Sequence, residues 1–322
     1  MAFPSILLAL VSYFLLLGIV EVSEASSRAL VNNNSINISQ IFEKWMEKHG
    51  RAYSNSSEKE KRFAIFKAKY EQMEKFNSQA KESFTLGLNA FSDLTHEELH
   101  ELYGNTLEIP NITRSSNSSF RYNSIKYEDL PQNWDWRTKG AVTKVKHQGT
   151  VCDCSKDYGT HGCAGGRSPN AIRYVAEYGL VSEEKYPYEA VDYNGCDTKL
   201  QETPDVTIYS YEFTPEFDEI ALAKAVYHQP VTIMHATSKE FYRYGGGVYA
   251  DSTGDCSRNN VSHTSLLVGY GTTSDGVNYW LLKNTWGESW GEQGYMRLLR
   301  STRKKLGRGI CNLAHLAMYP TL

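Results

Sequence analysis

Residues 259–271 read NNVSHTSLLVGYG and residues 279–295 read YWLLKNTWGESWGEQGY, and these two stretches decide the fold of the chain. Each contains a short run rich in Val, Leu and Tyr between Gly and Asn residues, which is typical of β-strands joined by tight turns. The pattern extends outward, and we expect strands over residues 231–234, 247–249, 265–270, 279–283 and 294–299, with a helix over 216–228. The second half is therefore predicted to form a small antiparallel β-barrel.

The first half of the chain has helical periodicity instead. Between residues 41 and 80, apolar side chains recur at steps of three and four on a strongly charged background. A further helix is expected to start at residues 94–98. Residues 104–127 are rich in Asn, Ser, Thr and Arg, a composition that indicates an exposed linker and a domain boundary.

Composition and charge exclude several classes of protein. The 322 residues are 41% hydrophobic, which is enough for a globular protein with a real core. The net charge of −3 gives no basic excess, and the one cationic run, residues 303–305, is interpreted as a solvated loop. Nucleic acid is therefore not an expected partner.

The N-terminus resembles a secretory signal peptide. Residues 6–20 form an apolar run that is too short to span a bilayer, and the small residues Ser23 and Ala25 follow it. We expect residues 1–25 to be removed, leaving no membrane segment. In that pathway the six Cys are expected to form disulfides. Sequons agree with this route and begin at Asn33, Asn37, Asn55, Asn111, Asn117 and Asn260.

Several motifs resemble those of the papain-like cysteine proteases. Glu58, Arg62, Phe66 and Asn77 match the spacing of the family's propeptide signature, from which Lys69 and Met73 depart. The string GLNAFSD at 87–93 resembles the second propeptide motif, and LPQNWDWRTKGAVTKVKHQG at 130–149 resembles the start of the mature enzyme.

This resemblance implies an α+β fold with a helical lobe and an antiparallel barrel lobe, preceded by an α-helical inhibitory propeptide. The expected domains are a signal peptide (1–25), a propeptide (26–127) and a peptidase domain (128–322), with activation cleavage at 127–131. The propeptide would contact the peptidase domain in cis. Delivery outside the cell or to a vacuole or lysosome is expected.

The resemblance also assigns catalytic roles. His263 would be the acid and base, Asn284 would hold its imidazole, and Trp286 would shield their hydrogen bond from water. Gln148 would donate to the oxyanion of the tetrahedral intermediate. The implied activity is that of a cysteine endopeptidase, which hydrolyses peptide or protein substrates through a thioester intermediate and needs no cofactor or metal.

The expected nucleophile is missing from its place in this scheme. Papain and cathepsins carry C-G-[SA]-C-[WY], with the His and Asn about 130 to 150 residues downstream. Between Gln148 and Cys163 this chain has only GTVCDCSKDYGTHG, and Cys154 lies 109 residues before His263. We therefore predict that the segment with the nucleophile and its helix is absent, that the helical lobe is truncated, and that catalysis is impaired.

Three interpretations of the cysteines remain open. The resemblance implies the disulfides Cys154–Cys196 and Cys256–Cys311, which would leave Cys152 and Cys163 as a third pair. Alternatively, Cys154 is the nucleophile, because it follows Gln148 by the six residues that separate these groups in the family. Zinc binding by Cys152, Cys154, His161 and Cys163 is the weakest alternative in a secreted chain.

The resemblance finally implies where substrate would bind. Gly165 and Gly166 would hydrogen-bond the substrate backbone, while Met234, Thr264 and Leu316 would line the main side-chain pocket and favour apolar residues. Trp286 would lie beside this cleft. A different function is also open: an inactive homologue could use its propeptide to bind and inhibit related proteases.

Overall fold

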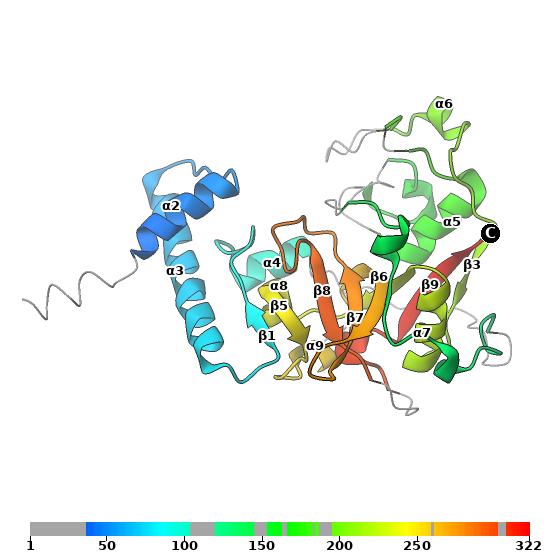
Figure 1. The fold of residues 1–322 in the computed structure, drawn as a ribbon. Coiled ribbons are helices and arrows are strands. Elements are labelled where there is room, and N and C mark those ends of the chain that lie inside the picture. The colour runs from blue at the N-terminus through cyan, green and yellow to red at the C-terminus, as the bar shows by residue number, and fades with distance from the viewer. Residues whose placement is uncertain are drawn as a thin grey trace, which may run out of the picture. The chain divides into compact units, whose positions relative to one another are not determined.

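The structure is a computed structural model that describes residues 37–103, 120–144, 153–162, 166–182, 184–186, 195–258, 261–301 and 307–322. The chain divides into two compact units, Met1–Lys67 and Ala68–Leu322, which are treated separately below (Figure 1). The predicted signal peptide and the sequons at Asn33, Asn111, Asn117 and Asn260 lie outside the described residues.

The first unit contains α2 (Ile38–Lys48) and the first half of α3 (Ser56–Gln79), so the helical periodicity is confirmed. The apolar faces of the two helices meet in an aromatic cluster, in which the Phe66 ring lies 5.1 Å from that of Phe42 and 5.2 Å from that of Trp45. In the propeptide signature, Arg62 donates to Glu58 one helical turn before it, at 2.7 Å. Phe66 of the signature therefore builds a small core with Phe42 and Trp45 of α2.

The second unit is built around a nine-stranded sheet. Its strands are β1 (Phe84–Leu86), β2 (Trp134–Asp135), β3 (Ser210–Phe213), β4 (Val231–His235), β5 (Tyr244–Tyr249), β6 (His263–Thr272), β7 (Asn278–Lys283), β8 (Tyr295–Leu299) and β9 (Leu316–Thr321). The order is β1-β5-β8-β7-β6-β4-β9-β3, with β2 paired to β6, and Figure 1 shows β6, β7 and β8 side by side. Every pairing is antiparallel except β5 with β8.

All five strands expected from the sequence are present, and the fold class is confirmed as α+β. Among the described residues of this unit, the second half of α3 is followed by the α-helices α4 (His96–Tyr103), α5 (Ser168–Tyr178), α6 (Thr198–Gln201), α7 (Glu219–His228), α8 (Lys239–Tyr242) and α9 (Asp255–Arg258). α7 begins three residues later than expected, because the Asp218 side chain caps it by accepting from the backbone N–H groups of Ile220 and Ala221. The positive φ of Phe217, +60°, prevents an earlier start.

Part of the core of the second unit lies between the sheet and α7. Leu222 and Val226 of α7 are fully buried together with Trp280 and Leu282 of β7. The Trp280 indole donates to Glu219 at 2.8 Å, so the polar atom of this large side chain is satisfied. Each such apolar side chain stabilises the fold by about 1.5–3 kcal/mol. Among the described residues, no helix is long and apolar enough to cross a membrane.

Candidate active site

His263 and Asn284 meet because β6 and β7 are neighbours. His263 is the first residue of β6, and Asn284 directly follows the last residue of β7. The Nε2 atom of His263 lies 2.8 Å from the Oδ1 atom of Asn284, which also accepts from the Thr285 backbone N–H at 2.8 Å. An oxygen that only accepts requires the imidazole proton on Nε2, which leaves Nδ1 as the free acceptor.

Trp286 covers this pair. Its indole is stacked on the His263 ring with centroids 4.6 Å apart, and both residues are buried. Burial lowers the pKa of His263 to about 4, and the hydrogen bond to Asn284 opposes this only in part. The imidazole is therefore neutral at pH 7, because burial outweighs the one partner that favours its charged form.

Cys154 has no free thiol in this structure. Its sulfur is bonded to Cys196, and a second disulfide joins Cys256 to Cys311. The reactive form of a cysteine is its thiolate, so Cys154 could act as the nucleophile only after reduction of its disulfide. The predicted pairing of Cys152 with Cys163 lies outside the described residues.

Gln148 and Gly165 also lie outside the described residues, so the predicted oxyanion donor cannot be placed. His161 is described, but two of the four proposed zinc ligands are not. Within the described ranges, no group of three or more His, Cys, Asp or Glu side chains could hold a metal ion.

The structure brings the predicted pocket residues together. Met234 of β4 lies opposite both Thr264 of β6 and Leu316 of β9 in the strand register. The Thr264 hydroxyl accepts from the Ser168 hydroxyl at 3.1 Å, which ties the first turn of α5 to the barrel. Met234 and Leu316 belong to a small buried cluster with Phe213, Val261 and Met318. Gly166 lies close to Thr160, where an added Cβ would come within 2.7 Å.

The sequence did not predict which surface holds the segment expected to be the propeptide. β1 adds to the edge of the sheet by pairing with β5, and the Gly87 N–H donates to the Arg243 carbonyl at 2.8 Å. The Asn89 side chain donates to the Tyr242 carbonyl at 2.8 Å. The run Gly245–Gly247 is the sequence signal for such a close backbone approach.

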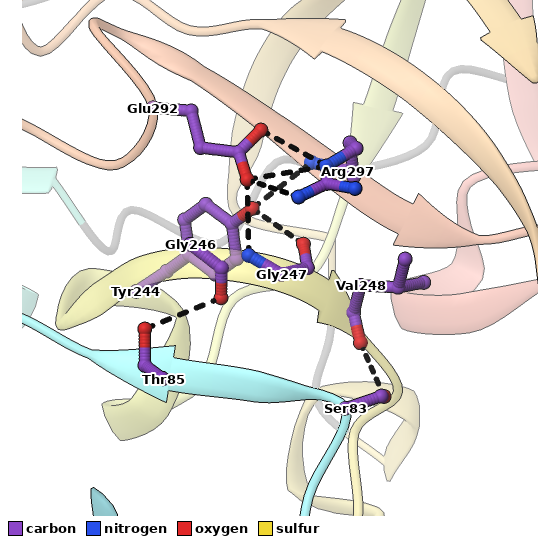
Figure 2. A network of polar contacts seen from close by, with 8 residues as sticks. All are labelled: Ser83, Thr85, Tyr244, Gly246, Gly247, Val248, Glu292 and Arg297. Carbon is purple, nitrogen blue, oxygen red and sulfur yellow. Dashed lines mark hydrogen bonds and ion pairs between the residues drawn. The ribbon is translucent and has the colours of Figure 1, made fainter. Parts of the chain in front are cut away.

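Figure 2 shows how this edge is fixed. The Ser83 hydroxyl donates to the Val248 carbonyl at 2.6 Å. On the other side, Glu292 accepts from the Gly247 N–H at 3.0 Å and forms an ion pair with Arg297 at 2.7 Å. The Glu292–Arg297 pair therefore holds the backbone of β5 in the shape that β1 requires.

The propeptide also reaches the aromatic cover of His263. Phe91, in the GLNAFSD motif, packs edge-on against Trp286 with ring centroids 5.4 Å apart. Lys69, which departs from the propeptide signature, donates to the Phe91 carbonyl at 2.9 Å, and Arg243 donates to the Lys69 carbonyl at 2.6 Å. Burial, and then the charge of Arg243, lower the pKa of Lys69 to about 8. Lys69 therefore adds a hydrogen bond to the GLNAFSD motif, although it departs from the propeptide signature.

Comparison with known proteins agrees with this geometry. The description "Papain family cysteine protease" matches residues 149–321, and "Cathepsin propeptide inhibitor domain (I29)" matches residues 42–99. The senescence-specific cysteine protease SAG39 of Oryza sativa subsp. japonica is 35% identical over 96% of this chain and 97% of its own. Vignain of Phaseolus vulgaris is 34% identical over 99% of this chain and 95% of its own.

Two solved proenzymes share the fold. A recombinant stem bromelain precursor matches with a TM-score of 0.74 and 30% identity, over 88% of this chain and 99% of its own. Digestive procathepsin L 3 of Tenebrio molitor matches with a TM-score of 0.76 and 30% identity, over 89% and 99%. The chain therefore belongs to the papain family of cysteine proteases and carries an inhibitory propeptide of the I29 type.

Proposed function

We propose that this chain is a papain-family endopeptidase zymogen that cannot complete the family's reaction, because the segment with the nucleophile is absent. The carrying observation is an assembled His263–Asn284 pair while Cys154 is held in a disulfide. The alignment with the rice relative supports this proposal, since it runs over 341 positions and the chain has only 322 residues. That relative therefore contains residues with no counterpart here.

The residues that remain would still perform their separate tasks. Asn284 would orient the imidazole, His263 would take and return the proton at Nδ1, and Gln148 would donate to the oxyanion. Without a thiolate, no bond forms to the scissile carbonyl, so the first step is lost while binding persists. Met234, Thr264 and Leu316 would favour an apolar residue in the pocket, and Gly165 and Gly166 would hold the substrate backbone.

The same proposal includes processing and location. Residues 1–25 would direct the chain into the secretory pathway, residues 26–127 would inhibit, and residues 128–322 would form the peptidase domain. The final location would be extracellular or a vacuole or lysosome. The six sequons would be available for glycosylation along this route.

Peptidase activity is the direct test. The full-length protein is incubated at pH 5 with a fluorogenic peptide in which the second residue before the cleaved bond is apolar. We expect the wild type to hydrolyse this peptide no faster than the His263→Ala variant does. An epoxide label specific for active-site thiols should not attach, whereas an active papain-family protease should be labelled and should cleave the same peptide. The proposal would be contradicted if the wild type hydrolysed the peptide and if both the His263→Ala substitution and thiol alkylation abolished that hydrolysis. Attachment of the label to Cys154 would assign the nucleophile to that residue.

A second candidate function is inhibition of related proteases by the propeptide. The observation that favours it is that the propeptide bonds mainly to backbone atoms of residues 242–249, through the β1–β5 ladder and the bond from Asn89 to Tyr242. Backbone bonds depend little on the partner's side chains, so a relative could offer the same edge.

Isolated residues 26–127 test this function. We expect the segment to inhibit a related protease at nanomolar concentration. Asn89→Ala should weaken inhibition about tenfold, because the bond that the Asn89 side chain donates to Tyr242 is lost together with the one it accepts from the Phe91 N–H. Ser78→Ala is the matched control, because among the described residues the Ser78 hydroxyl bonds within α3, to the Lys75 carbonyl. The candidate is rejected if an excess of the segment leaves the related protease fully active.

A further inference from the structure

Residues 120–127, here called the strap, are packed on the barrel lobe although they precede the expected cleavage window at 127–131. Phe120 is buried and belongs to the main core of the second unit. The strap therefore lies on the peptidase side of the molecule in space, while the sequence assigns it to the propeptide. Cleavage of the backbone at 127–131 would not by itself break any of its side-chain contacts.

An arginine of the strap is held by a carboxylate of the sheet. Arg121 forms a two-pronged ion pair with Glu212 of β3, with distances of 2.7 and 3.3 Å. Glu212 also accepts from the Tyr319 hydroxyl of β9 at 2.9 Å, so its position is fixed before Arg121 binds. The hydrogen bond from Arg121 is the main reason why the pKa of Glu212 is lowered. Such a fork recognises arginine better than lysine.

The neighbouring tyrosine is held from three sides. The Tyr122 ring is stacked on His228, at the end of α7, with centroids 4.4 Å apart and planes 6° from parallel. It also contacts Tyr319 at 5.5 Å, and its hydroxyl accepts from Gln229 at 3.1 Å. The Phe120 ring packs edge-on against Tyr122 at 5.7 Å, so the two aromatic residues flank Arg121 and support each other.

The strap is also attached at its other end. The Tyr127 hydroxyl accepts from Arg300 at 2.9 Å, and the Arg300 guanidinium lies over the Tyr270 ring at 4.8 Å. Lys224 of α7 reaches the Asn123 carbonyl at 3.4 Å. The surface thus offers a carboxylate, an imidazole, an amide and two cations at places that match successive groups of one short peptide.

We propose that Glu212, His228, Gln229 and Tyr319 form a peptide-binding site for an aromatic–arginine–aromatic sequence. The strap occupies this site in cis and stays bound after cleavage at 127–131. The proposal goes beyond peptide hydrolysis and does not depend on it, because none of these residues belongs to the candidate active site.

A labelled peptide tests the site on the full-length protein. In the host variant, Phe120→Gly, Arg121→Gly and Tyr122→Gly together disable the strap and free the site. We expect a fluorescein-labelled FRYNSIKY peptide to bind this variant saturably. The same peptide should bind at least tenfold more weakly to the wild type, because the strap fills the site there. A peptide with Glu in place of its Arg should bind the host at least tenfold more weakly, and Glu212→Arg in the host should restore that binding.

Two results would overturn the proposal. One is the absence of saturable binding to a host variant whose near-ultraviolet circular dichroism matches the wild type. The other is equal affinity for the Arg and Glu peptides. If the host variant does not fold, wild-type protein cut by a trace of protease both within residues 104–119 and at 127–131 replaces it, so that the strap is no longer joined to β1. The freed strap should remain in the native mass spectrum and leave only on denaturation. Loss of the strap under native conditions then rejects the site.

Discussion

Gly247→Ala is expected to detach β1 from β5. Gly247 has φ +91°, and an added Cβ would lie 2.4 Å from the Ser83 carbonyl oxygen and 2.7 Å from the Phe84 Cα. The backbone conformation alone costs about 1–3 kcal/mol for a residue with a side chain. Because the clash is with backbone, and β1 has only three residues, the strand cannot adapt and should separate. Amide hydrogen exchange of residues 84–86 should become at least tenfold faster.

Gly276→Ala is the matched control for this prediction. Gly276 also has a positive φ, +82°, but an added Cβ would meet no atom within 4 Å. Its conformational cost is therefore similar, while the exchange of residues 84–86 should not change. If both variants accelerate that exchange equally, general destabilisation rather than the overlap with β1 is responsible. If neither does, β5 does not hold the propeptide as the structure indicates.

The elements that could be predicted are those with a local signal. α2 and α3 follow from apolar residues at helical spacing, and β6 and β7 follow from apolar runs bounded by glycine. β9 and β3 were not predicted, because β3 has four residues and β9 contains Pro320, which interrupts a strand pattern. β1 is defined mainly by its partner, since three residues form a strand only against an existing edge.

The contacts of the candidate active site likewise divide into those that the sequence indicated and those without a local signal. The resemblance indicated His263 and Asn284 as partners, and the register of β6 and β7 supplies the distance that a separation of 21 residues cannot. Contacts between remote segments had no local signal: Phe91 and Trp286, or Lys69 and Arg243, meet only through tertiary packing. Cys154 has three possible roles in the sequence, and the disulfide with Cys196 is the one that this structure contains.

Two buried histidines should make the protein unstable in acid. His235 of β4 lies across from His263, with ring centroids 5.4 Å apart. Both ring nitrogens of His235 are bonded, to the Ala236 carbonyl at 2.8 Å and to the Ser265 hydroxyl at 3.0 Å, as suits a neutral imidazole. Burial, followed by the nearby His263, lowers the pKa of His235 to about 3, while burial lowers that of His263 to about 4.

The sign of the effect follows from proton binding. The unfolded chain takes up protons at these histidines near pH 6.5, whereas the folded chain does so only near pH 4 and pH 3. The free energy of unfolding is therefore highest above pH 6.5 and falls as the pH falls toward 4. Each histidine should contribute a loss on the order of 2–3 kcal/mol by pH 4, which is a large part of an ordinary domain's stability.

Urea unfolding at pH 7, 5.5 and 4.5, followed by tryptophan fluorescence, measures this loss. His235→Leu combined with Ser265→Val replaces the bonded pair by an apolar pair and should make the loss about half as large. His161→Gln is the control, because it removes an exposed histidine and leaves both buried rings in place. An unaltered pH dependence in the double variant would contradict a neutral, buried His235.

Insertion of a segment with a thiolate facing His263 should make the protein more stable in acid. That anion would raise the pKa of the imidazole and so reduce the fall in the free energy of unfolding at low pH.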